Sequence, residues 1–212
     1  MSEYLVHTEV FRRYTINVYY DEHADNPREE FDGMGTLILY YGDRNYYIGD
    51  KGHDYNIETA KTLWMGEYSE DDEDFSPPSL EEELKRGVVL PVYYRNYGAN
   101  GAKVWCGPPD YIWDDDGRQS GWIWISTSNI IKEYGEYNAD SIERCKKYLE
   151  GEIEILSQYF GGDVYCYDVV HRGEVIDSCG GFYGELDYCI ESAKNVVRAE
   201  YRYKRKKSHE RS

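Results

Sequence analysis

The sequence lacks the features that mark membrane and secreted proteins. None of its apolar runs approaches the roughly 20 residues that a membrane-spanning helix needs. Its first nine residues, MSEYLVHTE, show no basic segment followed by an apolar one, so no secretory leader is expected. We therefore expect a soluble protein that acts in the cytoplasm.

Cysteine is scarce, and its spacing excludes the common cysteine-based sites. The five cysteines stand far apart, without a CxxC pair and without histidine at zinc-ligand spacing. This pattern predicts reduced, mostly buried thiols. Cys179 would be a nucleophile if a histidine, His53 or His171, acted as its base. Asp177 would then orient that histidine. No local signature supports such a triad, so we expect Cys179 to be a small buried residue at a strand end.

Motifs for phosphate and calcium are also missing. The run from Gly98 to Lys103 is nearest to a phosphate-binding loop, but its glycine spacing differs and strand-like residues follow. The acids at 114–116 are consecutive, and Ile123 stands where a calcium loop needs its closing glutamate. Carboxylate pairs cannot be assigned from 41 acidic residues. We therefore expect no catalytic residues, no metal ion and no cofactor, and the sequence favours a binding protein over an enzyme.

Acidic charge dominates the composition. The chain has 41 Asp and Glu against 24 Lys and Arg, a net charge of −17. The last fifteen residues carry +5, so residues 1–197 carry −22. Such a body repels nucleic-acid backbones and anionic membranes and attracts proteins with basic grooves. We expect no direct contact with nucleic acid or membrane. The alternative is that the acidic charge serves only solubility. The basic tail is interpreted as the fraying end of a helix.

Periodicity predicts an α+β fold with an antiparallel or mixed sheet, several helices and a long C-terminal helix. Strands are predicted at 14–20, 36–41, 46–48, 88–94 and 122–125, and a hairpin joins 164–170 to 175–176. Helices are predicted at 57–68, 80–86 and 142–160 and from 187 onward, with a capping box at 140–143. The first three strand segments suggest an antiparallel meander. Most of the 24 tyrosines are interpreted as half-buried strand residues.

The acidic run at 69–78 ends in two prolines and predicts a linker or loop. It would separate a β-rich part at 1–68 from an α+β part at 79–212, unless the whole chain forms one domain.

Two acidic clusters lie beside aromatic residues, one at 70–74 and the other at 114–116. Acids next to aromatics are typical of a surface that imitates a phosphate strand with its bases, or that fills a basic groove. A solvated loop is the alternative. The residues predicted to bind a partner are Asp71, Asp72, Glu73, Asp74, Tyr111, Trp113, Asp114, Asp115 and Asp116.

Three stretches resemble a group of acidic, uncharacterised proteins of bacteriophages, prophages and plasmids. They run from DNPRE at 25–29 to YIGD at 47–50, from KVW at 103–105 to GWIW at 121–124, and from GDVY at 162–165 to CGGFYG at 179–184. The group brings no catalytic residues.

The resemblance implies a counter-defence role in a bacterial host cell, because small acidic proteins of mobile elements often inhibit restriction, CRISPR or other immune proteins. The chain is similar in charge and size to acidic antirestriction proteins that mimic DNA. The expected partner is the basic surface of a host defence protein. The sequence leaves the oligomeric state open, a homodimer included. The alternative function is a protein that binds or hydrolyses a nucleotide immune signal, with Tyr and Trp stacking on the base.

Overall fold

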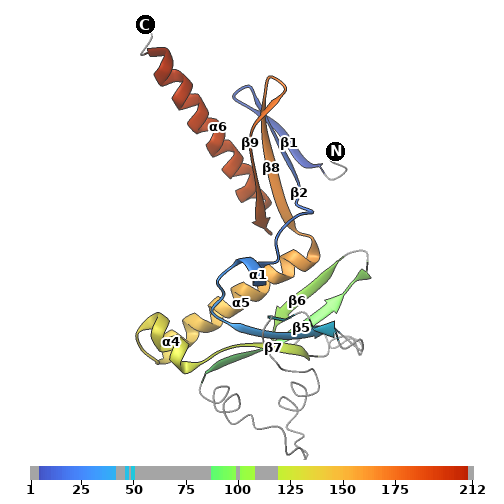
Figure 1. The fold of residues 1–212 in the computed structure, drawn as a ribbon, viewed down its shortest axis with the longest axis vertical. Coiled ribbons are helices and arrows are strands. Elements are labelled where there is room, and N and C mark those ends of the chain that lie inside the picture. The colour runs from blue at the N-terminus through green and yellow to red at the C-terminus, as the bar shows by residue number, and fades with distance from the viewer. Residues whose placement is uncertain are drawn as a thin grey trace, which may run out of the picture. The chain divides into compact units, whose positions relative to one another are not determined.

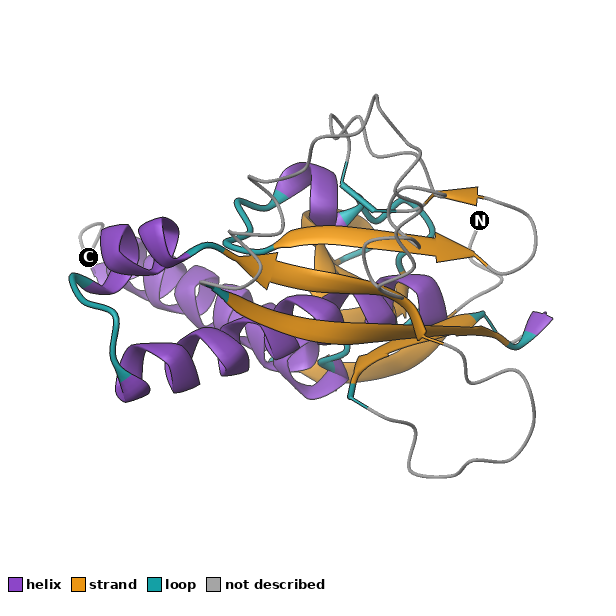
Figure 2. Cartoon of the chain, turned by 90° about the horizontal axis from the view of Figure 1, so that it is seen from below, coloured by secondary structure: helices purple, strands orange, loops and turns teal. Residues whose placement is uncertain are grey.

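The computed structural model describes residues 5–41, 46–47, 49–50, 87–98, 101–107 and 119–209. The chain forms two compact units. Unit 1 combines Met1–Asn26 with Gln158–Ser212, and unit 2 is Pro27–Ser157. Each unit contains an antiparallel sheet and at least one helix, so the predicted α+β class is confirmed (Figures 1 and 2).

Unit 1 is built on a four-stranded sheet in the order β1-β2-β8-β9. Its strands are β1 (Leu5–Phe11), β2 (Tyr14–Tyr20), β8 (Val164–His171) and β9 (Glu174–Tyr183). The predicted strand at 14–20 is confirmed, and its residues alternate between buried and partly exposed. Asn17 of β2 lies opposite Asp168 of β8, 151 positions later in the chain. The middle of this sheet therefore joins the N-terminal segment to the C-terminal segment.

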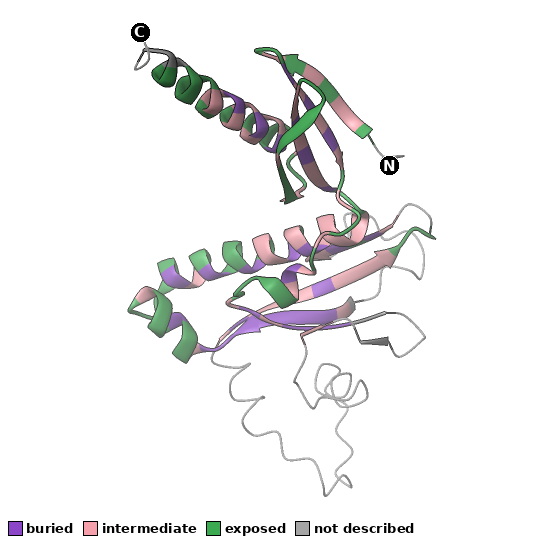
Figure 3. Cartoon of the chain, turned by 45° about the horizontal axis from the view of Figure 1, so that its top comes forward, coloured by how far each residue is buried: buried purple, intermediate pink, exposed green. Residues whose placement is uncertain are grey.

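The core of unit 1 lies between this sheet and the C-terminal helix α6 (Leu186–His209). Cys189, Ala193 and Val197 recur at steps of four and are fully buried, and they form one cluster with Ile16 and Val18 of β2. Figure 3 shows this buried stripe on the first half of α6, whereas the last turns of the helix are exposed. The helix begins where the sequence predicts it, and it continues through the basic residues.

Unit 2 contains a five-stranded antiparallel sheet in the order β4-β3-β7-β5-β6. Its strands are β3 (Thr36–Tyr41), β4 (Tyr46–Tyr47), β5 (Val88–Asn96), β6 (Ala102–Cys106) and β7 (Gln119–Ile125). Consecutive residues at 37–39 of β3 and at 122–125 of β7 are buried, so both faces of these central strands are shielded from water. This pattern explains why the two segments are continuous apolar runs rather than alternating ones.

The described residues of unit 2 form the helices α1 (Pro27–Glu30), α4 (Thr127–Tyr134) and α5 (Ala139–Gly161), and the last four residues of α5 belong to unit 1. The predicted helix at 142–160 is confirmed, but its capping box is not the predicted one at 140–143. Asn138 caps the helix, because its Oδ1 accepts from the Ser141 backbone N–H at 2.9 Å. The Asn138 N–H donates in return to Ser141 Oγ at 2.9 Å.

Several predicted elements are confirmed and others need correction. The strands at 36–41, 88–94 and 122–125 and the 164–176 hairpin are confirmed. The meander is wrong, because the strand at 14–20 lies in a different sheet from the strand at 36–41. Strands β1 and β6 and helices α1 and α4 were not predicted. The helices predicted at 57–68 and 80–86 and the linker predicted at 69–78 lie outside the described residues. Among the described residues, no helix is both long and apolar enough to cross a membrane.

Candidate functional site

The residues predicted to bind a partner lie outside the described part of the chain. They are Asp71, Asp72, Glu73, Asp74, Tyr111, Trp113, Asp114, Asp115 and Asp116. Two segments carry them, residues 51–86 and residues 108–118. The structure describes the residues to which both segments are attached, all of them in unit 2.

Negative charge is concentrated in unit 2. This unit has 27 Asp and Glu against 13 Lys and Arg, a net charge of −14, whereas unit 1 has 14 against 11, a net charge of −3. Residues 51–86 carry −7 and residues 108–118 carry −3. Most of the excess acid of the chain therefore belongs to the two segments that contain the predicted partner-binding residues.

The first acidic segment begins after Asp50, which is fixed to the edge of β3. The Asp50 N–H donates to the Leu37 carbonyl oxygen at 2.9 Å, and Asp50 Oδ2 accepts from the Leu37 N–H at 2.8 Å. The segment ends before Gly87, which leads into β5, where Val88 pairs with Ile125 of β7. The first attachment point is thus hydrogen-bonded to a strand of the sheet, and the second directly precedes one.

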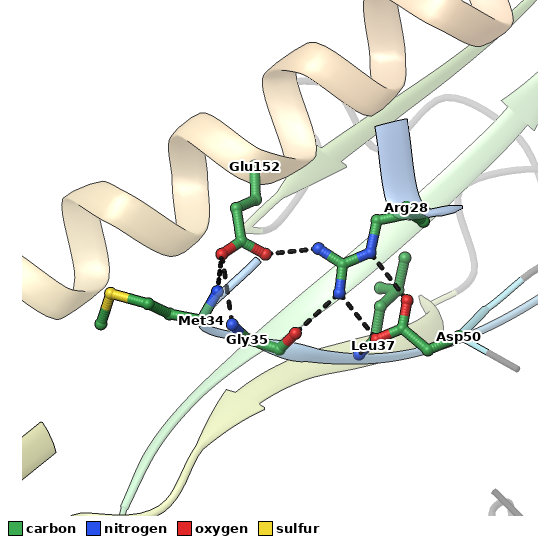
Figure 4. Close-up of polar contacts among 6 residues, drawn as sticks. All are labelled: Arg28, Met34, Gly35, Leu37, Asp50 and Glu152. Atoms are coloured by element: carbon green, nitrogen blue, oxygen red, sulfur yellow. Dashed lines mark hydrogen bonds and ion pairs between the residues drawn. The ribbon is translucent and has the colours of Figure 1, made fainter. Parts of the chain in front are cut away.

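A buried arginine holds Asp50 in place (Figure 4). Arg28 lies on the short helix α1, and its side chain is only 9% exposed. Its Nε donates to Asp50 Oδ1 at 2.7 Å, and its Nη2 donates to Asp50 Oδ2 at 2.6 Å. The same Nη2 donates to the Gly35 carbonyl oxygen at 2.6 Å. The two parallel bonds to one carboxylate form the bidentate pairing that arginine makes and lysine cannot.

Glu152 of α5 completes this cluster from the helix side. Arg28 Nη1 donates to Glu152 Oε2, and Glu152 Oε1 accepts from the Met34 N–H at 2.6 Å and from the Gly35 N–H at 3.2 Å. A Cβ on Gly33 would lie 2.9 Å from both Arg28 Nη1 and Glu152 Oε2, so the loop passes close to the ion pair. We name Arg28, Asp50 and Glu152 the anchor cluster.

The anchor cluster joins α1, β3 and α5 around the start of the first acidic segment. Burial lowers the pKa of Arg28, but the hydrogen bonds and charges of Asp50 and Glu152 outweigh burial and raise that pKa. The arginine is therefore charged at neutral pH. Its chemical role is to compensate two carboxylates that would be costly to bury alone.

The second acidic segment is attached on either side of β5. It begins after Gly107, whose N–H donates to the Pro91 carbonyl oxygen at 3.3 Å, and it ends before Gln119, which pairs with Tyr93. The Tyr93 ring stacks on the Trp105 ring with centroids 5.7 Å apart. Pro91 lies next to a bulge, because the β5–β7 register shifts between Val92 and Tyr93.

The structure does not assemble the nucleophile considered from the sequence. Cys179 is exposed in the middle of β9 rather than buried at a strand end. It pairs with Tyr167 of β8, whereas His171 pairs with Glu174, four positions along the strand. Four positions are about 13 Å, which is too far for a hydrogen bond between them. His53 lies outside the described residues. Cys145 and Cys189 are buried as expected, and Cys106 and Cys166 are partly buried.

A polar network crosses the sheet of unit 1 on the face opposite the core. Thr8 Oγ1 donates to Asn17 Oδ1 at 2.8 Å, and Asn17 Nδ2 donates to Asp168 Oδ1 at 2.8 Å. Tyr19 Oη donates to Asp168 Oδ2 at 3.1 Å. Burial, together with the Asp168 charge, raises the pKa of Tyr19. Each of these bonds joins side chains of two neighbouring strands, so the network stabilises the pairing of β1 with β2 and of β2 with β8.

One groove of unit 1 bears on the alternative of a nucleotide ligand. It lies between β9 and α6, has a volume of about 450 Å³, and is lined by Ile176, Asp177, Val196, Ala199, Glu200 and Tyr203. Two carboxylates at its wall repel an anionic phosphate. Within the described ranges, no group of three or more His, Cys, Asp or Glu side chains is placed to hold a metal ion.

Sequence reasoning missed the anchor cluster. Arg28 lies in a polar segment without helical or strand periodicity, and Glu152 is one of many acids on α5. An arginine directly after proline at a helix start, followed by two glycines at 33 and 35, was the available signal. No protein-family model, no curated protein sequence and no solved structure matches this chain.

Proposed function

We propose that the protein is a counter-defence protein of a bacteriophage, prophage or plasmid. In the cytoplasm of the bacterial host it binds the basic surface of an immune or nucleic-acid-processing protein and inhibits it stoichiometrically. The acidic clusters at 70–74 and 114–116 imitate the phosphate backbone of DNA in this complex, and the neighbouring aromatic residues occupy the places of bases.

The observation that carries this proposal is the division of charge between the two units. Unit 2 carries −14 of the net −17, and residues 51–86 and 108–118 account for −10 of it. A dense negative charge accelerates association with a positive partner, because the attraction acts before contact. Charge spread evenly for solubility would not concentrate in two segments of one unit.

The anchor cluster supports the proposal by fixing where the first acidic segment starts. Asp50 is held by Arg28 and by Leu37, so the chain leaves the sheet from a defined point. Gly107 and Gln119 attach the second segment to β5. A binding segment that starts and ends on a rigid sheet loses less conformational freedom on binding than a free tail does.

A capture experiment with an acid-to-amide variant tests this function. The tagged chain is used to purify partners from a bacterial host that carries restriction and CRISPR systems. The rate of association with the captured protein is then measured between 0.1 M and 1 M salt, over which the Debye length falls from about 10 Å to about 3 Å. In the test variant Asn or Gln replaces Asp71, Asp72, Glu73, Asp74, Asp114, Asp115 and Asp116. The parent chain should associate with the captured protein more slowly as the salt concentration rises. The variant should associate at least about tenfold more slowly than the parent chain at 0.1 M salt.

A charge-matched control separates local from total charge. It replaces seven exposed acids of unit 2 by amides, namely Glu30, Asp32, Glu133, Glu136, Glu143, Glu150 and Glu154. This control should keep the parent's inhibition, because only the two clusters contact the target. The proposal fails if the test variant inhibits its target as well as the parent does, with unchanged salt dependence.

A further inference from the structure

Arginine occupies two hairpin turns in a backbone conformation that favours glycine. The β1–β2 turn consists of Arg12 and Arg13, with φ of 51° and 70°, and the β8–β9 turn consists of Arg172 and Gly173, with φ of 55° and 86°. Positive φ at both turn residues defines the type I′ hairpin, for which Asn-Gly is the usual sequence. A side chain with a Cβ is disfavoured there by steric contact with the backbone. Three arginines therefore occupy positions where smaller residues would fit better, which points to a function for their charge.

The fold brings these two turns to the same end of the sheet (Figure 1). Strands β2 and β8 are neighbours, and the rings of Tyr14 and His171, next to the two turns, are stacked with centroids 4.3 Å apart. His171 Nδ1 lies 3.2 Å from the Arg13 carbonyl oxygen. The turn centres are two strand spacings apart, about 10 Å. Four successive phosphates of one nucleic-acid strand span a similar length, because three steps of about 3.4 Å each add up to about 10 Å.

The last turns of α6 add further cations at this end. The helix returns antiparallel to β9, so its C-terminal half reaches the hairpin turns: Lys204 Nζ lies 3.0 Å from Tyr14 Oη, and the Arg12 guanidinium lies over the Tyr201 ring at 5.1 Å. We define the basic end as seven exposed cations, namely Arg12, Arg13, Arg172, Arg202, Lys204, Lys206 and Lys207. The acids next to them are Glu174 after the second turn, Asp177, which lines the β9–α6 groove with Tyr203, and Glu200, which pairs with Lys204 at 3.4 Å. The local net charge is therefore +4.

Exposed aromatic rings lie between these cations. Tyr201 and Tyr203 are 50% and 55% exposed, and Lys207 Nζ lies 4.8 Å above the Tyr203 ring. The contact with Tyr203 raises the pKa of Lys207, and the hydrogen bond with Tyr14 raises that of Lys204, so both are charged at neutral pH. Cations that follow a backbone, interleaved with exposed rings on which bases stack, are typical of single-strand binding surfaces.

We propose that the basic end of unit 1 binds a single strand of DNA or RNA. Its cations contact the phosphates, and Tyr201 and Tyr203 stack on bases. This inference is independent of the function proposed for unit 2. The expectation of no direct nucleic-acid contact used the charge of residues 1–197 as a whole. Unit 1, whose last fifteen residues carry +5, has a net charge of only −3. At 0.15 M salt, charges more than about 8 Å away are largely screened, so the local +4 decides short-range contacts.

The same surface is poorly suited to an anionic membrane. A helix that lies in the membrane interface needs a wide apolar face opposite its cations. After Tyr201 the helix continues as Arg-Tyr-Lys-Arg-Lys-Lys-Ser-His, in which Tyr203 is the one residue with a large apolar part. This composition favours phosphates with bases over phosphates with acyl chains.

Fluorescence anisotropy with the full chain tests the proposal. The probes are a labelled 20-nucleotide single-stranded DNA, an RNA of the same sequence and the 20-base-pair duplex, each between 50 mM and 200 mM salt. Single strands should bind more tightly than the duplex, and log Kobs should fall with log salt at a slope of about −3 to −5, as expected for four to seven phosphate contacts. The test variant Arg12→Asn/Arg13→Gly/Arg172→Asn gives both turns the Asn-Gly sequence, so it removes three charges while keeping the hairpins. Its affinity should fall at least about tenfold, with a slope smaller in magnitude by about 2.

Two controls make the result specific. The variant Lys132→Gln/Lys146→Gln/Lys147→Gln removes three exposed cations of unit 2 and should bind like the parent chain. Tyr201→Ala/Tyr203→Ala should weaken the binding of single strands. The proposal is overturned if no strand binds at 50 mM salt, if the turn variant binds as tightly as the parent chain, or if the duplex or a phosphatidylserine vesicle binds more tightly than the single strands.

Discussion

Arg28 and Asp50 form a bidentate ion pair inside unit 2, with donor–acceptor distances of 2.7 and 2.6 Å. The side chain of Arg28 is 9% exposed and that of Asp50 is 18% exposed. The pair joins a helix start to the edge of β3 at the point where the first acidic segment leaves the described fold. Glu152 contacts the same guanidinium from α5, so one cation compensates two carboxylates.

Replacing Arg28 by methionine should destabilise unit 2 strongly. The variant leaves Asp50 and Glu152 partly buried without their cation, and breaking a buried pair in this way costs about 3–5 kcal/mol. Arg28→Lys should recover only part of the loss, because an ammonium group cannot make the two parallel bonds. Urea denaturation followed by tryptophan fluorescence measures the change, since Trp122 and Trp124 are buried in this unit.

The control for this prediction is an exposed pair on α5. Lys147 lies 3.6 Å from Glu143 at helical spacing, and both side chains are more than half exposed. Lys147→Gln should therefore change the free energy of unfolding by less than about 0.5 kcal/mol. A loss below about 1 kcal/mol in Arg28→Met would show that the anchor cluster does not stabilise the unit.

Gly121 is the position in β7 that tolerates no side chain. A Cβ there would lie 1.8 Å from the Ile38 carbonyl oxygen of the neighbouring strand, so β3 and β7 would have to separate. Gly121→Ala should destabilise unit 2 by about 3 kcal/mol or more, since backbone atoms cannot move away as a flexible side chain can. Thermal or urea unfolding gives the value.

At Gly151 of α5 the same substitution by alanine should raise stability instead of lowering it. A Cβ there meets nothing within 4 Å, and the residue lies inside a helix. Gly151→Ala should stabilise the chain by about 1 kcal/mol through helix propensity. If Gly121→Ala leaves stability unchanged or raises it, the close approach at Gly121 is not what limits that position.

The sequence predicted most of the strands but not their partners. Alternation at 14–20 showed that Ile16 and Val18 face a core, and burial confirms it. Alternation does not tell which strand lies alongside, so the pairing of Asn17 with Asp168 could not be predicted from local pattern. Long-range pairing of this kind also groups the first 26 residues with residues 158–212.

The sequence predicted the acid-rich segments of the candidate site but not the residues that hold them. Acid-rich segments can be recognised from local counts, and these segments lie outside the described residues. The anchor cluster depends on three residues at positions 28, 50 and 152, each ordinary in its local sequence, so geometry alone reveals it. The sequence shows the cations of the α6 tail directly. Arg12 and Arg172 join them in the basic end only because β2 pairs with β8.

Stability of unit 1 should fall at high pH through Tyr167. This ring is 6% exposed, its hydroxyl donates to Asp177 at 3.4 Å, and burial followed by the Asp177 charge raises its pKa from 10 to about 12. Between pH 10 and 12 the unfolded chain loses this proton while the folded chain keeps it. The contribution of Tyr167 is therefore complete below pH 10 and decreases as pH rises toward 12, by up to about 1.4 kcal/mol per pH unit.

Urea unfolding at pH 8, 10 and 11 checks this dependence. Cys189, whose pKa burial raises from 9 to about 12, adds a decrease of the same sign that begins near pH 9. Tyr167→Phe removes the tyrosine part, so its stability should fall less steeply above pH 10 than that of the parent chain. Tyr188→Phe, at a 61% exposed position of α6, should leave the slope as in the parent. An identical slope in Tyr167→Phe would contradict the assignment.

Relieving the hairpin turns should stabilise unit 1 even though it removes charge. Arg172 has a φ of 55°, and asparagine tolerates this left-handed conformation better than arginine does. Arg172→Asn should therefore raise the free energy of unfolding by about 0.5–1 kcal/mol. Arg172→Ala removes the same charge but keeps a Cβ without a compensating side-chain hydrogen bond, so it should bring no gain.

The first turn should respond in the same direction. Arg12→Asn/Arg13→Gly relieves two strained positions but loses the contacts of Arg12 with the Phe11 and Tyr201 rings, at 5.3 and 5.1 Å. Those contacts are worth about 0.5–1 kcal/mol at an exposed site, against about 1–3 kcal/mol of strain at each turn residue. Urea denaturation should therefore show a higher midpoint for the double variant. A lower midpoint would mean that ring packing holds the arginines in place, and that their presence in the turns needs no partner to explain it.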